Sequence, residues 1–304
     1  MGKRRATLMT EVAIATKAPR LNRAARIWTM GVWFLPFGLF AVLFLFLPSI
    51  GLFVGSLTGG PHGLTLDNFG QLFQSQYLDA YKVSVELSAA TAVIGAVVGV
   101  VLAWAMVGGG LPRFLRPFFL TFSGVASNFA GIPLAFAFTA SLGPVGMVTL
   151  FLSHHLGLNL YQSGFSLFGF SGLVITYLYF QIPLMVLLMV PALDNMSRWG
   201  EAAMNLGASP WQFWWHIGLP ILRLPLLGAT LLLFGNSFGA YATAYALTSG
   251  MINLVPIVIG QELSGNVVFS PNLADALAVG MILIMITIFA IYLITNRNVV
   301  RWQR

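Results

Sequence analysis

Residues 200–220, GEAAMNLGASPWQFWWHIGLP, bring polar and aromatic side chains together in a chain that is otherwise strongly apolar. The carboxylate of Glu201 is followed by the small side chains of Ala202 and Ala203. Small side chains on an exposed segment allow another surface to come close. The stretch is therefore a candidate contact surface, and we predict no catalytic residue in it.

The same stretch predicts two short helices that meet at an elbow. A helix over 198–206 should end at Gly207, because glycine accepts the left-handed conformation found just after helix ends. A second helix should begin with Ser209 as its N-cap, Pro210 in its first position and Gln212 completing an S-x-x-Q capping box. The alternative is a linker that rests on the lipid surface, anchored by Trp211, Trp214 and Trp215.

Long apolar stretches on both sides must position this elbow. Hydrophobic residues make up 58% of the 304 residues and charged residues 8%, far below the share of charge in soluble domains. Six stretches are long enough to cross a bilayer as helices, and none shows the alternation of a β-barrel. We therefore predict an all-α integral membrane protein with six transmembrane helices, near 32–57, 80–106, 114–142, 167–192, 218–246 and 273–295.

The basic residues predict the orientation. All of the 15 lysines and arginines except Lys82 fall on one side of these spans, so this side is expected to be cytoplasmic and to hold both termini. The formal net charge is +7, but the basic residues lie beside spans and no nucleic-acid-binding motif accompanies them. We expect membrane lipids as their partner and no nucleic acid.

Three parts follow from this organisation. Residues 1–30 are predicted to form a basic cytoplasmic tail, 31–79 the first transmembrane helix with an outer link, and 80–304 a five-helix core that includes the segment 198–215. The link 143–166 has no formal charge and an apolar centre too short to span, which suggests a helix in the outer interface. Gly95 and Gly99 form one of several G-x-x-x-G pairs, which favour close helix contacts.

Several chemistries have no motif in this chain. A phosphate-binding loop G-x-x-x-x-G-K-[ST] is absent, so ATP is not bound by that device. The H-E-x-x-H zinc motif is also absent, and the chain has no cysteine. The neighbours His154 and His155 would point to different faces of a helix. We predict no metal, no cofactor and no enzymatic activity.

The segment EAA at 201–203, with Gly207, Phe213, Ile217 and the LP pair at 219–220, resembles the EAA signature of permease subunits of binding-protein-dependent ABC importers of the bacterial inner membrane. The likeness covers about residues 80–295. It implies that 198–215 docks on a cytoplasmic ABC ATPase dimer, which hydrolyses ATP in place of this chain. The residues that it assigns to coupling are Glu201, Ala202, Ala203, Gly207, Ser209, Phe213, Ile217 and Pro220.

The resemblance also implies a second permease subunit, a different chain rather than a copy, and a separate substrate-binding protein. Within the family, the chain is most similar to the polyamine, ferric iron, thiamine and aminophosphonate branch, on the stretches ALDNMSRWGEAAMNLGAS and FGNSFGAYATAYALTSG (234–250). A polyamine is therefore the expected cargo.

An ion-coupled secondary carrier or a multispan membrane enzyme is the alternative function. Such proteins are expected to carry charged relay or catalytic groups deep in their spans, and these spans have none there. The candidate pathway residues are Glu86, Asn128, Asn236, Ser237, Tyr241 and Asp275. Each has a structural alternative: the polar groups join helices, Glu86 pairs with Lys82, and Asp275 begins a helix.

Overall fold

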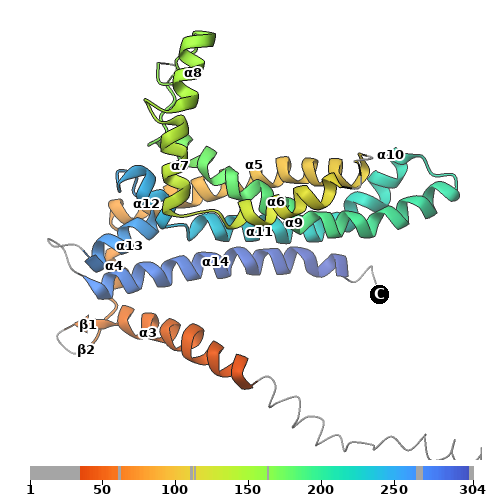
Figure 1. Ribbon diagram of the computed structural model, residues 1–304. Helices are drawn as coiled ribbons and strands as arrows, with labels where there is room; N and C mark the ends of the chain where they lie inside the picture. The colour runs from red at the N-terminus through yellow and green to blue at the C-terminus, as the bar shows by residue number, and fades with distance from the viewer. Residues whose placement is uncertain are drawn as a thin grey trace, which may run out of the picture. The chain divides into compact units, whose positions relative to one another are not determined.

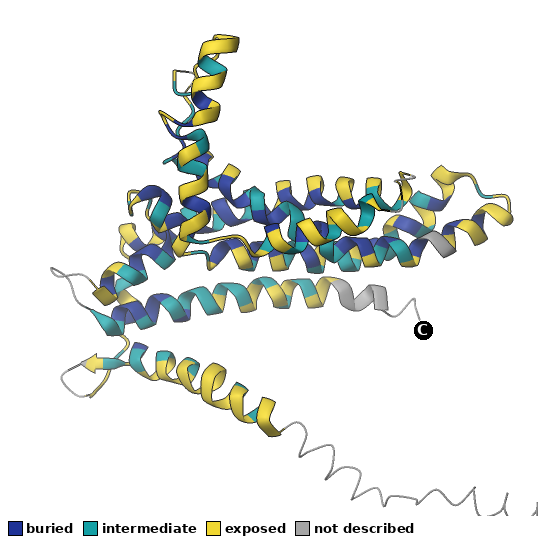
Figure 2. Cartoon of the chain, in the orientation of Figure 1, coloured by how far each residue is buried: buried dark blue, intermediate teal, exposed yellow. Residues whose placement is uncertain are grey.

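The structure, a computed structural model, describes residues 35–60, 63–109, 112, 114–162, 164–264 and 270–300, and the tail predicted over 1–30 lies outside them. The chain divides into two compact units, residues 1–54 and residues 55–304. In the first unit the described residues are helical from Leu35, with a π-helical turn η1 (Val42–Phe46), and they continue into α3 (Leu47–Ser56). Apolar side chains cover this helix and are exposed along it (Figure 2), as expected for a surface that faces lipid or another chain.

The second unit is built on three long helices that pack along one another. They are α5 (Ser75–Gly108), α9 (Phe170–Asn205) and α11 (Leu219–Phe238) (Figure 1). Gly95 and Gly99 of α5 face α9, and a Cβ atom added at Gly99 would lie 2.5 Å from the Cβ of Met185. The predicted close helix contact at this G-x-x-x-G pair is confirmed, because any larger side chain would push α5 away from α9.

Six helical segments of the described residues are long and apolar enough to cross a membrane: Leu35–Ser56, Ser75–Gly108, Ile132–Leu156, Phe170–Asn205, Pro210–Phe238 and Pro271–Thr295. The predicted number is confirmed. The third span was predicted as one continuous helix over 114–142, and this prediction is wrong. It is broken at residues 129–131 into α6 (Leu115–Asn128) and α7 (Ile132–Leu142), and α8 (Met147–Leu156) follows α7.

Gly131 causes this break. Its φ of +75° belongs to the left-handed region, which interrupts helical hydrogen bonding, and Pro133 supplies no N–H group in the next turn. The predicted span 218–246 is also interrupted, at residues 239–241 between α11 and α12 (Ala242–Thr248), but without a left-handed residue. α6 packs against α9 inside the bundle, whereas α7 packs against α12.

The end of the second unit opposite the elbow holds short elements. β1 (Thr58–Gly60) pairs antiparallel with β2 (Gly63–Leu64), and α4 (Asp67–Gln71) follows. After α12, the chain turns into α13 (Val255–Ser264) and then enters α14 (Pro271–Val300), which packs against α13. Of these elements, α13 packs against α5 and α4 packs against α14.

Candidate functional site

The elbow begins at the end of α9 with a tight glycine turn. The amide of Ala208 donates to the carbonyl oxygen of Ala203 at 3.0 Å, and the amide of Gly207 donates to that of Met204 at 3.0 Å. This pair of bonds is a Schellman motif, which requires the left-handed conformation that Gly207 adopts with φ +85°. The predicted helix stop at Gly207 is confirmed.

The second half of the elbow starts as the sequence indicated. The amide of Gln212 donates to Ser209 Oγ at 3.3 Å, and the amide of Ser209 donates to Gln212 Oε1 at 2.9 Å. This capping box opens α10 (Pro210–Phe213), which runs through a π-helical turn η2 (Trp214–Gly218) into α11. The predicted capping box is confirmed. The separate helix predicted over 198–206 is wrong, because α9 continues to Asn205 without an interruption, so the elbow is rigidly continuous with a long span.

The elbow has one buried side and one exposed side. Ala203 and Phe213 are buried and hold the two halves together, whereas Glu201, Ala202 and Ser209 are exposed. Leu206, which the sequence analysis did not single out, is 89% exposed at the turn and adds an apolar side chain to the exposed side of the elbow. The sequence analysis placed the turn at Gly207, so the position of Leu206 directly before it could have indicated that its side chain lies at the turn.

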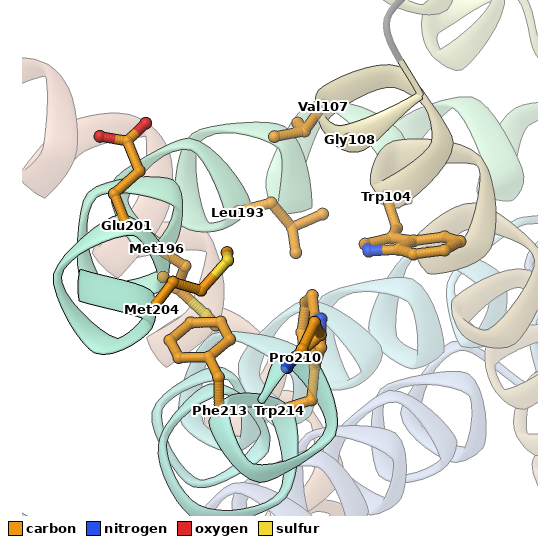
Figure 3. A pocket seen from close by; sticks show the side chains of 11 residues that line it. Trp104, Val107, Gly108, Leu193, Met196, Glu201, Met204, Pro210, Phe213 and Trp214 are labelled. Carbon is orange, nitrogen blue, oxygen red and sulfur yellow. The ribbon is translucent and has the colours of Figure 1, made fainter. Parts of the chain in front are cut away.

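A cavity of about 300 Å³ lies inside the elbow, between its two halves and the end of α5. Trp104, Met204, Phe213 and Trp214 surround it, and Figure 3 shows the carboxylate of Glu201 pointing away from its centre. The Glu201 carboxylate is therefore directed outward, where it can meet a cationic group of another protein. Of the other predicted coupling residues, Ile217 and Pro220 are half-buried in η2 and α11.

A second cavity, of about 400 Å³, opens where the two broken spans meet. The amide of Gly131 donates to Thr243 Oγ1 at 2.7 Å and joins the two breaks. Predicted residues Asn236 and Tyr241 line this cavity, together with Ser127, Thr243, Phe180 and backbone of both breaks. Irregular backbone is found at membrane depth where it is buried in protein or lines a cavity, so this position fits a solute pathway.

Ser237 has a different environment. Its hydroxyl lies 2.8 Å from Thr91 Oγ1, which accepts a 2.9 Å hydrogen bond from Gln181 Nε2. All three side chains are buried and link α11, α5 and α9. The structural alternative, that such groups join helices, fits Ser237 better than contact with a solute.

The other predicted pathway residues lie outside the cavity lining. Asn128, exposed at the end of α6, donates to the carbonyl oxygen of Gly124 at 2.8 Å. Glu86 is exposed on α5, and no ion pair joins it to the exposed Lys82 within the described chain. Asp275 is half-buried in the second turn of α14 with its carboxylate against Gly55, so it does not begin the helix. Glu86 and Asp275 therefore share no site with Asn236 and Tyr241, whereas Asn128 adjoins the cavity through a 3.4 Å hydrogen bond to Ser127 Oγ.

A buried carboxylate in α13 was missed by the sequence analysis. Glu262 of α13 is 8% exposed, and its Oε1 accepts a hydrogen bond from Tyr77 at 3.1 Å. Its Oε2 has no partner among the described residues. Nothing in the local sequence distinguished Glu262 from an exposed carboxylate, because its burial depends on the packing of α13 against α5.

An ion pair connects two helices just before the elbow. Arg116 at the start of α6 binds Asp194 of α9, and both side chains are partly exposed. Asp194 lies seven residues before Glu201 on the same helix. The pair therefore links the start of the broken span to the helix that carries the elbow.

Comparison with known proteins gives consistent results. Residues 95–304 match the family described as "Binding-protein-dependent transport system inner membrane component". The chain is 27% identical over 271 residues to the probable sulfate transport system permease protein cysT of Zygnema circumcarinatum, covering 84% of each chain. It is 28% identical over 160 residues to a spermidine/putrescine transport system permease protein PotC homolog of Mycoplasma pneumoniae, covering 52% of this chain and 51% of that protein.

A solved structure shows the same fold. A chain of the bacterial alginate ABC transporter, in complex with an alginate pentasaccharide-bound periplasmic protein, aligns with a TM-score of 0.70 at 19% identity. The alignment covers 93% of this chain and 98% of that chain.

Proposed function

This chain belongs to the family of binding-protein-dependent transport system inner membrane components, and we propose that it forms half of the pathway through which an ATPase drives a polyamine-like cation inward. It is an ABC importer permease, a multipass protein of the inner membrane and not an enzyme. The proposal adds the ATPase as a docking partner, a second permease as the other half of the pathway, and the cargo.

The observation that carries the proposal is the outward-facing elbow between two spans. Glu201, Ala202 and Leu206 are exposed at a turn whose own geometry is fixed by the Schellman motif and the capping box. A rigid, exposed surface with one carboxylate and one large apolar side chain is suited to insertion into a complementary groove. We propose that this groove belongs to a cytoplasmic ATPase, which places a basic group opposite Glu201.

The cavity at the helix breaks supports the pathway. Its lining carries no formal charge, so no charged side chain has to be buried at membrane depth. The amide of Asn236 and the ring of Tyr241 form part of the lining. Tyr241 stacks on Tyr245 with ring centroids 5.4 Å apart, and both rings are exposed by more than a third. Aromatic faces attract ammonium groups, as cation recognition in a pathway requires.

The outer surface also favours a cation. With the predicted orientation, the outer side carries Lys82 and the carboxylates of Asp67, Asp79, Glu86, Glu262 and Asp275. The positive-inside rule explains the shortage of lysine and arginine there, but it does not explain the carboxylates, since acidic residues contribute little to orientation. Their negative potential would concentrate a polyamine and repel an anion.

Sulfate is the second candidate cargo. The relative that aligns over 84% of this chain is named a sulfate transport permease, whereas the polyamine permease relative aligns over 52%. The relatives therefore favour sulfate, and the polyamine proposal is supported instead by the aromatic faces and the carboxylates of this chain.

The test is substrate-stimulated ATP hydrolysis. The chain, purified with its co-expressed ATPase, second permease and binding protein in lipid nanodiscs, should hydrolyse ATP faster with putrescine or spermidine than without. Sulfate should have no effect. Stimulation by sulfate alone would replace the polyamine with the second candidate, and failure of any ATPase to co-purify would contradict the docking proposal.

A further inference from the structure

An apolar groove of about 350 Å³ lies where the elbow meets the spans α5, α9 and α11. Met189 and Leu193 of α9 and Leu222 of α11 are buried and form its floor. Val101 of α5 and Leu219 of α11 are exposed and form its walls. Every side chain that lines the groove is aliphatic, a methionine or a tryptophan. The groove is therefore a concave apolar surface with helices on three sides.

The groove runs beside the spans and does not lie beyond their ends. Val100, which lines it, comes eight residues before Gly108 at the end of α5, which is about 12 Å of helix. On α11 the lining extends from Leu219, the first residue of the helix, to Leu226, which is about 10 Å. Both helices belong to segments long enough to cross a bilayer. The inner part of the groove is therefore at a depth that a water-soluble protein does not reach.

Three tryptophans line the groove near the elbow: Trp104, Trp211 and Trp214. Within the described part of the chain, none of their indole N–H groups donates a hydrogen bond to a protein atom. Indole suits the boundary of a bilayer, because its ring is apolar and its N–H group needs an acceptor. The ester and phosphate oxygens of a phospholipid are acceptors at that depth. The tryptophans therefore point to a lipid headgroup at this end of the groove.

The charges near the groove favour a negative headgroup. Arg223 is exposed on α11, one turn after Leu219 in the wall, so the two residues are neighbours on the helix surface. The lining contains no carboxylate, and Asp194, which follows Leu193 of the floor, is paired with Arg116. A cation without a carboxylate in the adjoining groove attracts anionic lipid.

The size of the groove favours an acyl chain over another helix. A volume of about 350 Å³ along about 10 Å of α11 gives a mean cross-section of about 35 Å², less than half that of a helix about 10 Å across. An extended acyl chain is thinner than a helix. In the groove it gains van der Waals contacts on three sides, whereas a flat helix surface offers contacts on one side.

We propose that the groove binds one anionic phospholipid of the cytoplasmic leaflet, with an acyl chain on the buried floor and the headgroup at the three indoles and Arg223. The proposal uses the predicted orientation but does not depend on the cargo, the ATPase or the second permease. Trp104, Leu193 and Trp214 also border the cavity inside the elbow (Figure 3). The lipid therefore supports the elbow from the membrane side and leaves its exposed side free.

Photo-crosslinking with a lipid probe tests the groove. The full chain, with the subunits that accompany it, is placed in phosphatidylcholine nanodiscs that contain phosphatidylglycerol with a diazirine on its acyl chain. Mass spectrometry after irradiation should find adducts on the residues of the groove. Unlabelled phosphatidylglycerol should displace the probe about fivefold more effectively than added phosphatidylcholine, and Arg223→Gln should remove this preference.

A matched pair of variants tests whether the groove itself holds the lipid. Val101→Trp places a large ring in the wall and should eliminate the adducts on the floor of the groove. Val97→Trp is the control, because Val97 is exposed one turn earlier on the same helix and does not line the groove. The adducts should persist in Val97→Trp.

Two results would overturn the proposal. Equal labelling of all exposed apolar surfaces, displaced equally by both lipids and unchanged in Val101→Trp, would mean bulk membrane lipid only. Labelling of other exposed surfaces without adducts in the groove would mean that protein covers it. Either result leaves the importer assignment and the docking of the elbow standing. Failure of an ATPase to co-purify would contradict the docking proposal without affecting the lipid site.

Discussion

Glu201 is the charged residue whose role can be tested most directly, because its side chain is exposed and points away from the elbow cavity. Glu201→Lys should place a cation opposite the expected basic group of the ATPase and reduce substrate-stimulated ATP hydrolysis by about tenfold or more. Glu201→Gln, which removes the charge without reversing it, should reduce it less. Equal activity of Glu201→Lys and the unsubstituted transporter would contradict electrostatic docking at this residue.

Gly207 fixes the direction of the chain at the elbow. Its φ of +85° is accessible to glycine and moderately to asparagine, but a β-branched residue there costs about 1–2 kcal/mol. An added Cβ would contact no neighbour within 4 Å, so the effect isolates backbone strain from crowding. We expect Gly207→Val to uncouple ATP hydrolysis from transport and Gly207→Asn to preserve the coupling, measured as ATP hydrolysis and uptake in the same proteoliposomes. Full coupling in Gly207→Val would mean that the turn tolerates another geometry.

At the scale of elements, the ion pair between Arg116 and Asp194 connects α6 to α9. Both side chains are partly exposed, so the pair should contribute less than about 1 kcal/mol to stability. We expect the pair to matter for transport rather than for stability, because it links the broken span to the helix that carries the elbow. Asp194→Arg should lower transport with little change in thermal stability, because two cations then repel each other.

The reversed pair provides the control for this linkage. Combining Arg116→Asp with Asp194→Arg restores opposite charges in the exchanged order and should recover transport in part, measured by uptake into proteoliposomes. A double variant as inactive as Asp194→Arg would show that Asp194 acts through other contacts.

At the scale of the whole molecule, the basic residues predict the orientation in the membrane, with both termini on the cytoplasmic side. The chain has no cysteine, so single cysteines report position without background. We chose two exposed apolar residues, Leu158 beyond α8 and Leu206 at the elbow. Leu158→Cys should react with a membrane-impermeant maleimide added outside intact spheroplasts, and Leu206→Cys should react only after lysis. The opposite pattern would invert the topology and with it the proposed docking side.

The sequence by itself determined the features that depend on neighbours along the chain. The number of apolar segments, the stop at Gly207 and the capping box of Ser209 and Gln212 follow from composition and local hydrogen bonding, and the structure contains all of them. The contact at Gly95 and Gly99 also followed from spacing, since two small residues one turn apart form a flat strip on a helix. Gly131 and Pro133 could have predicted the break in the third span, because glycine and proline interrupt helices. The hydropathy pattern alone indicated a continuous span.

The tertiary structure decided what depends on residues far apart in the chain. Asn236 and Tyr241 came together with Ser127 because two separate helix breaks meet through Gly131 and Thr243. Ser237, one residue from Asn236, turned instead toward Thr91 and Gln181, because adjacent residues of a helix face different directions. The burial of Glu262 and the projection of α7 and α8 likewise arise from packing between distant elements, which a hydropathy pattern does not encode.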